Sequence, residues 1–336
     1  MKHLICLLAF LTLLQPLPIF ASEASGVPYL VALGDSITTG YELPGGRYGC
    51  ANYVNLTAES LSLPQNGYAN YAVNGYRAGD LLTLLPEYRD DIARAGILVF
   101  DIGYNDILSV LYSAMCRAMK GDYYLAEIAG AFRALPKEEQ EETLRRLPSV
   151  EHEPYLLALY AQFEADLTAI LDTLHEYAPE ARIYMQSIYN PLAALGVFTD
   201  FSNGAVEKLN GILADAAKKY GCGFLDVYTA FSANESAYTY MSRWDIHPNE
   251  EGHRVISALF TEALEADGFA PRTAASEEAG NEASETSGVI SESVQEPGAA
   301  PAAQRRALSP FLLLLCIPLL FAVIPILYIK RSRRRR

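Results

Sequence analysis

The sequence predicts an α/β protein, a three-layer α/β/α sandwich around a central parallel sheet of about five strands. Between residues 27 and 270, short apolar runs alternate with longer segments in which apolar residues recur every three or four positions. Strands that alternate with helices favour a parallel sheet covered by helices on both faces. In addition, glycine or a polar side chain follows four of the runs, at the carboxyl ends where open parallel sheets form their sites.

Along the chain, each expected strand is an apolar run that ends near glycine or a polar residue, and the helices lie between the runs. The last two helices have the clearest periodicity of apolar residues. The expected strands are Tyr29–Leu33, Tyr68–Val73, Ile97–Ile102, Ile183–Ile188 and Phe224–Tyr228. The expected helices are Tyr48–Leu61, Pro154–Tyr177, Asn203–Tyr220 and Asn249–Ala266.

Residues 1–21 are expected to be a secretory signal peptide. Lys2 precedes an apolar run from Leu4 to Leu14, and the segment closes on Ala21. A short basic start, an apolar stretch and a small residue near the cleavage point are typical of such a peptide. A membrane anchor is the alternative, but the run is short and two prolines end it.

A transmembrane helix is expected at residues 308–329, followed by a basic cytoplasmic tail at 330–336. This almost wholly apolar segment would span about 33 Å at about 1.5 Å per residue, enough for a hydrocarbon core of about 30 Å. The basic tail should stay in the cytoplasm, which places the rest of the chain outside the cell membrane. A polybasic end disfavours a buried core helix, and the lack of Leu-Pro-x-Thr-Gly disfavours a cell-wall sorting signal.

Residues 27–270 are long enough for one sizeable core, whereas 271–307 are expected to be a disordered linker. From Arg272 to Arg306 the composition turns to Ala, Glu, Ser, Gly, Thr and Pro, which cannot bury enough apolar surface to fold. Residues 1–21 and 308–336 together hold seven of the 26 basic residues and none of the 40 acidic ones. The chain between them therefore has a net charge of 19 − 40 = −21. This charge disfavours nucleic acid as a partner.

Three cysteines remain outside the two apolar end segments, namely Cys50, Cys116 and Cys222. In an oxidising compartment this odd number allows either one disulfide with one free thiol or three buried thiols. The sequence does not choose between these states. It has no Cys-x-x-Cys and no His-Glu-x-x-His, and we expect no metal and no other cofactor.

Ser36 is the candidate nucleophile, because it follows the first expected strand in the block Gly34-Asp35-Ser36. A serine that leaves a strand and enters a helix exposes its hydroxyl and leaves its backbone N–H free. The hydroxyl is a weak nucleophile, so acyl transfer needs a base for its proton and donors for the developing oxyanion. The alternative is a helix N-cap, a position that Ser and Asp also favour.

His247 is the candidate base, because Pro248 and Asn249 begin a helix directly after it and fix its loop. The other histidines of the folded part, His152, His175 and His253, are interpreted as surface or structural residues.

Gly75 and Asn105 are candidate oxyanion donors, through a backbone N–H and a side-chain amide. Each can equally be a turn residue. Asp106 is expected to hold its loop in place rather than to do chemistry.

The four blocks together resemble those of the SGNH (GDSL) hydrolase family over about residues 28–266. The resemblance implies a flavodoxin-like sandwich, the SGNH hydrolase fold, and a GDSL-type serine esterase or lipase. It implies Ser36 as nucleophile, His247 as general base, and an oxyanion hole made by the N–H groups of Ser36 and Gly75 with the Asn105 amide. The sequence contains no Gly-x-Ser-x-Gly motif, which disfavours an α/β-hydrolase. A chymotrypsin-like protease needs its catalytic histidine before the serine, and here only His3 precedes Ser36.

The catalytic acid departs from the family's pattern. That acid usually stands three residues before the histidine, where this chain has Trp244, while Asp245 stands two before. Either Asp245 reaches the imidazole in a shifted loop, which we favour, or a main-chain carbonyl near Trp244 orients the ring. A carbonyl can partly replace the carboxylate, because the acid mainly fixes the tautomer and orientation of the histidine.

The expected function is a membrane-anchored extracellular esterase or lipase that acts on a lipid, a lysophospholipid or an acetylated glycan. The segment from Ile107 to Tyr177 is either a helical cap over the site or an extension of the core, and Tyr41–Gly49 is expected to touch a substrate beside Ser36. Two alternatives remain open. The first is an O-acyltransferase, which would use the same residues. The second is a non-catalytic module that binds a glycan or lipid, although such a module would not need Ser36, Asn105 and His247 at three strand ends.

Overall fold

A central parallel sheet of five strands organises the computed structural model, which describes residues 28–148, 154–232 and 234–269. The strands lie in the order β2-β1-β3-β4-β5, the flavodoxin-like order, with the switch point between β1 and β3. The predicted fold class is therefore confirmed. The strands are β1 (Leu30–Leu33), β2 (Tyr68–Asn70), β3 (Ile97–Phe100), β4 (Arg182–Gln186) and β5 (Gly223–Leu225).

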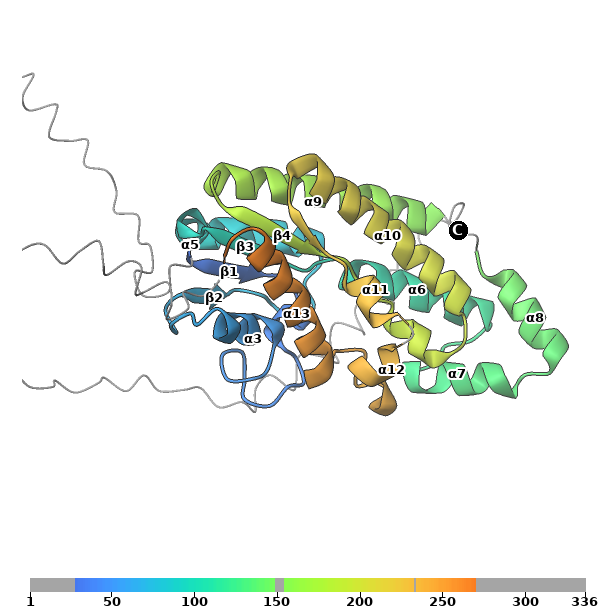
Figure 1. Ribbon diagram of the computed structural model, residues 1–336. Helices are drawn as coiled ribbons and strands as arrows, with labels where there is room; N and C mark the ends of the chain where they lie inside the picture. Colours follow the sequence, from blue (N-terminus) through green and yellow to red (C-terminus); the bar gives the residue numbers. More distant parts are fainter. Residues whose placement is uncertain (1–27, 149–153, 233, 270–336) are drawn as a thin grey trace, which may run out of the picture. The chain divides into compact units, whose positions relative to one another are not determined.

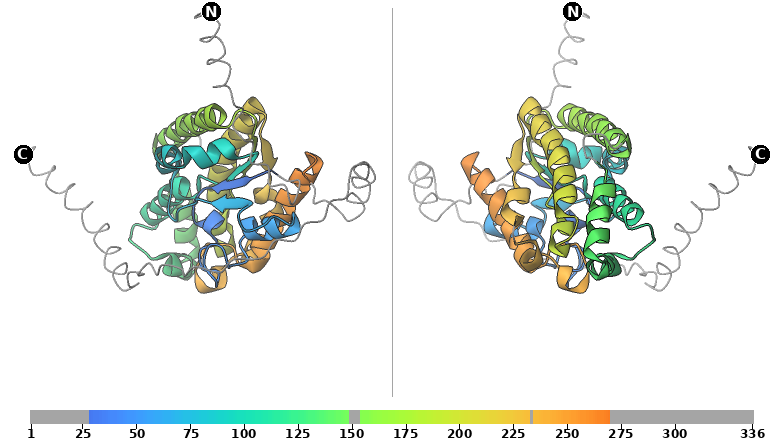
Figure 2. Two further views of the ribbon diagram at one scale, coloured as in Figure 1. Left: turned by 90° about the vertical axis from the view of Figure 1, so that its left-hand side faces the viewer. Right: turned by 90° about the vertical axis from the view of Figure 1, so that its right-hand side faces the viewer.

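Helices cover both faces of this sheet (Figures 1 and 2). One face packs against α3 (Tyr53–Ser60) and α13 (Glu250–Ala266), and the other against α9 (Pro154–Tyr177) and α10 (Thr199–Tyr220). Every residue of β1 and β3 is buried between these layers, which explains why both strands are continuous apolar runs. The remaining helices are α2 (Ser36–Thr39), α4 (Ala78–Leu84), η1 (Leu85–Tyr88), α5 (Arg89–Arg94), α6 (Tyr104–Ala118), α7 (Leu125–Ala134), α8 (Lys137–Arg146), η2 (Pro191–Leu195), α11 (Val227–Phe231), α12 (Glu235–Tyr238) and η3 (Met241–Arg243).

The five predicted strands all exist, and the first ends at Leu33 as predicted, but the other four end two or three residues earlier than predicted. The clearest error concerns Phe224–Tyr228, because its second half belongs to helix α11. Asp226 caps that helix, and its side chain accepts a hydrogen bond from the backbone N–H of Thr229 at 3.1 Å. An Asp directly after an apolar run is an N-cap signal that overrides the apolar residues after it.

The helix prediction was correct at both ends for α9 (Pro154–Tyr177) and less accurate at the start of the other three helices. Asn249 caps α13 by accepting from the N–H of Gly252 at 3.0 Å, one residue inside the predicted boundary. Asn52 likewise caps α3, so the predicted helix Tyr48–Leu61 was wrong for its first residues. Helix α10 begins at Thr199, four residues before the predicted start.

The segment from Ile107 to Tyr177 extends the core. The inner faces of α6 and α7 contribute buried apolar side chains to the same hydrophobic cluster as the sheet, including Leu111, Met115, Ile128 and Phe132. Figure 1 shows α6, α7 and α8 reaching past the edge at which the strands end.

Several expectations fall on parts of the chain that the structure does not describe. The signal peptide at 1–21, the linker at 271–307, the transmembrane helix at 308–329 and the basic tail at 330–336 all lie outside the described residues. Within residues 28–148, 154–232 and 234–269, no helix is both long and apolar enough to cross a bilayer. In the same ranges Cys50, Cys116 and Cys222 are free thiols, and Cys50 is buried.

Candidate active site

Ser36 begins helix α2 directly after β1, at the carboxyl edge of the sheet. The N-cap of this helix is Asp35, whose Oδ1 accepts the N–H of Ile37 at 2.9 Å. The alternative role expected for Ser36, capping, is thus taken by its neighbour. This leaves the Ser36 hydroxyl available for other contacts.

Gly34 is required by a close approach of Asp101. A Cβ at position 34 would lie 2.0 Å from Oδ1 of Asp101 and 2.6 Å from its backbone oxygen. The φ angle of Gly34 is also +135°, in the region that side chains rarely adopt. Both facts make glycine the residue that fits before the Asp35-Ser36 pair.

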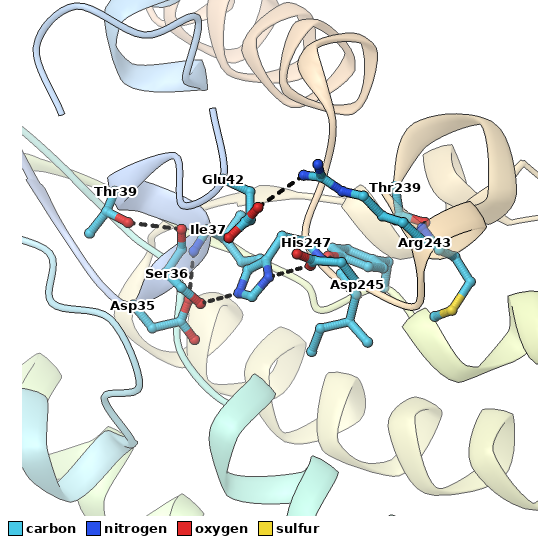
Figure 3. A network of polar contacts seen from close by, with 12 residues as sticks. Asp35, Ser36, Ile37, Thr39, Glu42, Thr239, Arg243, Asp245 and His247 are labelled. Atoms are coloured by element: carbon cyan, nitrogen blue, oxygen red, sulfur yellow. Dashed lines mark hydrogen bonds and ion pairs between the residues drawn. The ribbon is translucent and has the colours of Figure 1, made fainter. Parts of the chain in front are cut away.

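Ser36, His247 and Asp245 form one hydrogen-bonded chain (Figure 3). Ser36 Oγ lies 3.0 Å from His247 Nε2, and His247 Nδ1 lies 2.6 Å from Asp245 Oδ1. All three come from loops or helix starts at the same edge of the sheet. This is the geometry of a nucleophile, a base and an acid that orients the base.

The shifted position of Asp245 is explained by a local turn. Its Oδ1 accepts the backbone N–H of His247 at 2.9 Å as well as the ring contact. A short acidic side chain that bonds the N–H two residues on forms an Asx-turn. The turn folds the carboxylate back under the ring, so a separation of two residues is enough.

The hydrogen-bond partners fix the protonation of the His247 ring. An ionised carboxylate only accepts hydrogen bonds, so the proton of a neutral imidazole sits on Nδ1, facing Asp245. Nε2 then carries the lone pair and accepts from the Ser36 hydroxyl. The ring is poised to take that proton.

Further contacts hold the His247 loop. Tyr189, buried at the end of β4, donates its hydroxyl to the backbone oxygen of Ile246 at 2.7 Å. The Tyr240 N–H donates to the oxygen of His247 at 2.9 Å. The ring of Tyr41 lies 4.6 Å from the His247 ring, centroid to centroid. These side chains restrict where the imidazole can move.

Two backbone N–H groups near the catalytic chain of contacts have no hydrogen-bond acceptor in the part of the chain that the structure describes. Among the described residues, neither the N–H of Ser36 nor that of Gly75 donates a hydrogen bond. Gly75 has φ +82°, and no atom lies within 4 Å of the place that its Cβ would occupy. Position 75 therefore needs glycine for its backbone conformation rather than for lack of space.

The Asn105 amide is already engaged. Its Nδ2 donates to Asp35 Oδ2 at 3.0 Å and to the backbone oxygen of Tyr76 at 2.9 Å, which uses both protons. Asp106 beside it accepts the N–H of Ala78 at 3.2 Å and thereby ties α6 to the start of α4. Burial raises the pKa of Asp106 to about 6.

The other histidines stand apart from this chain of contacts. His253 is fully buried in α13, where its Nδ1 accepts the backbone N–H of Tyr53 at 3.3 Å. His175 is half-buried in α9, its Nδ1 2.8 Å from the oxygen of Leu171. His152 lies outside the described residues.

An ion pair that the sequence did not suggest spans the site. Glu42 lies in the loop after α2 and Arg243 in η3, and their side chains meet at 3.0 Å (Figure 3). Glu42 and Trp244 both have positive φ angles, +69° and +64°, although neither is glycine. The partners are separated by 201 positions, and no local pattern marks either of them.

A cavity of about 430 Å³ is lined by the loop that follows α2, three or more residues after Ser36, and not by Ser36 or His247 themselves. The predicted substrate-contacting loop lines one side of it, and the loop before Gly75 lines the other. Its walls combine polar and apolar side chains, including Thr39, Tyr41, Leu43, Arg47, Val73 and Asn74. Arg47 is held in place by bonds to the backbone oxygens of Asn70 and Ala72.

Comparison with known proteins agrees with this geometry. The model of the GDSL-like Lipase/Acylhydrolase family matches residues 32–255. The uncharacterized protein YpmR of Bacillus subtilis (strain 168) is 24% identical over 247 residues, which cover 71% of this chain and 82% of that protein.

Among solved structures, a lipase from a goat rumen metagenome matches with a TM-score of 0.50 and 18% identity, over 72% of this chain and 98% of that one. A phospholipase A1 from Streptomyces albidoflavus matches with a TM-score of 0.49 and 17% identity, over 71% of this chain and 99% of that one. The first of these likenesses supports the fold.

Proposed function

The chain belongs to the GDSL-like lipase/acylhydrolase family and is a serine carboxylic ester hydrolase, and from this premise we propose that it works through an acyl-enzyme on Ser36. The observation that carries the proposal is the chain of hydrogen bonds from Ser36 Oγ through His247 to Asp245, with contacts of 3.0 and 2.6 Å. A ligand-binding module would have no need of a serine hydroxyl aimed at a basic nitrogen.

In the first half-reaction, His247 Nε2 takes the proton of Ser36 while Oγ attacks the ester carbonyl carbon. The tetrahedral intermediate collapses, and the imidazolium gives its proton to the leaving alcohol. Water then attacks the acyl-enzyme with the same base, and the acid is released. Asp245 keeps the ring oriented and stabilises its positive charge during both steps.

The oxyanion would be bound by the N–H groups of Ser36 and Gly75, with the Asn105 amide as third donor. The two N–H groups have no competing acceptor among the described residues. The amide must share a proton that it now gives to Asp35 or Tyr76. Donors aimed at the developing negative charge are commonly the largest single contribution to such catalysis.

The substrate that we propose is an ester of a lipid, a lysophospholipid or an acetylated glycan at a cell surface. The expected signal peptide at 1–21 and apolar segment at 308–329 support a single-pass membrane protein with an extracellular catalytic domain. The linker at 271–307 would hold the enzyme near its membrane. The cavity of about 430 Å³ in the loop after Ser36, with Tyr41 and Leu43 among polar neighbours, suits an acyl or sugar group of modest size.

Hydrolysis of p-nitrophenyl esters from acetate to palmitate tests the proposal, with the full-length protein in detergent and its Ser36→Ala variant. We expect turnover by the wild type alone, and the preferred chain length to separate a deacetylase from a lipase. A fluorophosphonate should label Ser36 covalently. If the folded wild type neither turns over any ester nor becomes labelled, the proposal is wrong. Transfer of the acyl group to an added sugar instead of water would identify an acyltransferase.

A further inference from the structure

Two carboxyl groups lie buried side by side beneath the nucleophile. Asp35 precedes Ser36 and Asp101 follows β3, and both have no exposed surface. The parallel register pairs Leu33 with Phe100, so the residues one step further on, Gly34 and Asp101, are neighbours as well. The missing side chain of Gly34 is what admits the Asp101 carboxyl to this place.

Three of the four carboxyl oxygens have a donor. Asp35 Oδ1 accepts from Ile37 N–H and Oδ2 from the Asn105 amide. Asp101 Oδ1 accepts from the Thr38 hydroxyl. The fourth oxygen, Asp101 Oδ2, is buried and has no partner among the described residues. A buried carboxyl oxygen without a donor is costly, so a proton should be directed at it.

No cation compensates the pair. Among the described residues, neither carboxyl forms an ion pair with Lys, Arg or His. Two carboxylates in contact at a buried site cannot both ionise at moderate cost. Burial, followed by the charge of Asp101, raises the pKa of Asp35 well above its usual range. Burial also raises the pKa of Asp101, but the hydrogen bonds from Asp35 and Thr38 act in the opposite direction and favour its charged form.

We propose that Asp35 and Asp101 share one proton, which Asp35 carries and donates to Asp101, and that neutral Asp35 is a positioning residue for Ser36 and Asn105. The proposal rests on the proposed hydrolase function. It assigns the single negative charge of the pair to Asp101, the member that does not touch the Asn105 amide. It also gives the orphan oxygen of Asp101 a donor.

The location of this charge matters for the oxyanion. A hydrogen bond to an ionised acceptor is roughly twice as strong as one to a neutral acceptor. An anionic Asp35 would therefore hold the Asn105 amide firmly and repel the negative charge that develops beside it. A neutral Asp35 still orients the amide and caps α2, but leaves the amide able to share its proton.

None of the neighbouring titratable groups that the structure describes supplies a positive charge or a second protonated carboxyl group at pH 8. Burial raises the pKa of Tyr53, Tyr104 and Tyr189 well above the usual range, so these phenols stay neutral. Burial lowers the pKa of His253 to about 3, so that ring is neutral as well. Asp106, with a pKa of about 6, is ionised in mildly alkaline solution. The Asp35 proton is then the one left to observe.

Isosteric variants of the two carboxyls distinguish the proposal from simple packing. Asp35→Asn keeps a neutral group that donates to Asp101 and an oxygen that can accept from Ile37, but its NH₂ cannot accept from the Asn105 amide. Its kcat should therefore fall, by less than about tenfold. Asp101→Asn moves the charge to Asp35, and kcat should fall about 10- to 100-fold with little change in KM, part of the loss expected for an oxyanion donor. Asp267→Asn, at the opposite edge of the sheet beside Arg182, is the matched control and should change neither constant.

Infrared spectroscopy at pH 8 provides a readout that does not depend on activity. Wild type should show the C=O stretch of a protonated carboxylic acid, and Asp35→Asn should lack it. Circular dichroism and unfolding midpoints verify that each variant folds. Absence of the band in the wild type, or equal losses of kcat in the two folded variants, would overturn the proposal. A wild type that shows the band but hydrolyses no ester would instead refute the proposed function.

Discussion

Glu42 and Arg243 form an ion pair at 3.0 Å that joins the loop after the nucleophile to the loop that carries the base. Glu42 itself has a left-handed backbone conformation, and Arg243 directly precedes Trp244, which has one as well. Such conformations cost about 1–3 kcal/mol each and persist where the surroundings hold them. The ion pair is one of the contacts that holds them here.

Breaking this pair should affect catalysis more than stability. The side chains are 34% and 52% exposed, so Glu42→Gln or Arg243→Met should cost at most about 1 kcal/mol of unfolding free energy. We expect kcat to fall severalfold, because the His247 loop loses a tie to the nucleophile's loop. The exposed pair Glu250–Arg254 in α13 is the control. Equal kcat for Glu42→Gln and Glu250→Gln would contradict the expectation.

Asp245→Asn should lower kcat by about 10²- to 10⁴-fold, with KM nearly unchanged. The amide does not stabilise an imidazolium, and its NH₂ can donate to Nδ1 and so favour the wrong tautomer. Steady-state kinetics across pH 6 to 9 on one soluble ester provide the measurement. A loss of less than about threefold would instead favour a backbone carbonyl near Trp244 as the group that orients His247.

Gly75→Ala should lose activity beyond its effect on stability. A side chain at φ +82° strains the backbone by about 1–2 kcal/mol, although it meets no atom within 4 Å. Gly221 has φ +68° and equally open surroundings at the end of α10, so Gly221→Ala is a matched control for strain. Both variants should unfold at similarly reduced denaturant concentrations. Only Gly75→Ala should lower kcat, because only Gly75 is proposed to donate its N–H to the oxyanion.

His253 should make the protein less stable in mild acid. Burial lowers its pKa from 6.5 to about 3, so below pH 6.5 the unfolded chain binds a proton that the folded protein does not. The stability from this ring is fully present above pH 6.5 and is lost as the pH falls, by about 2 kcal/mol at pH 5.

Urea unfolding at pH 7 and pH 5 tests this expectation. His253→Gln removes the titration, so its unfolding free energy should drop by about 2 kcal/mol less than that of the wild type between the two pH values. An identical drop in both proteins would mean that other groups cause the acid lability.

The fold was predictable because each strand is a buried apolar run, and because glycine or polar residues follow at one edge of the sheet. The same reasoning selected Ser36 and His247, and the resemblance to the family added Asp245; the structure brings all three into contact. That reasoning placed Tyr228 in a strand, because an apolar run does not reveal where an Asp cap turns it into a helix. It also missed Asp101 and the partners of Glu42, since those contacts join residues far apart in sequence and depend on side-chain packing.

The turn at Asp245 has a consequence for how relatives are recognised. Because one oxygen binds both the main chain and the ring of the same histidine, the acid's place is fixed by loop shape rather than by counting positions from the histidine. A search pattern that requires a fixed spacing between the acid and the histidine would classify such an enzyme as a Ser-His dyad and overlook its acidic residue. Genome surveys of serine esterases should therefore score an acidic residue at either interval.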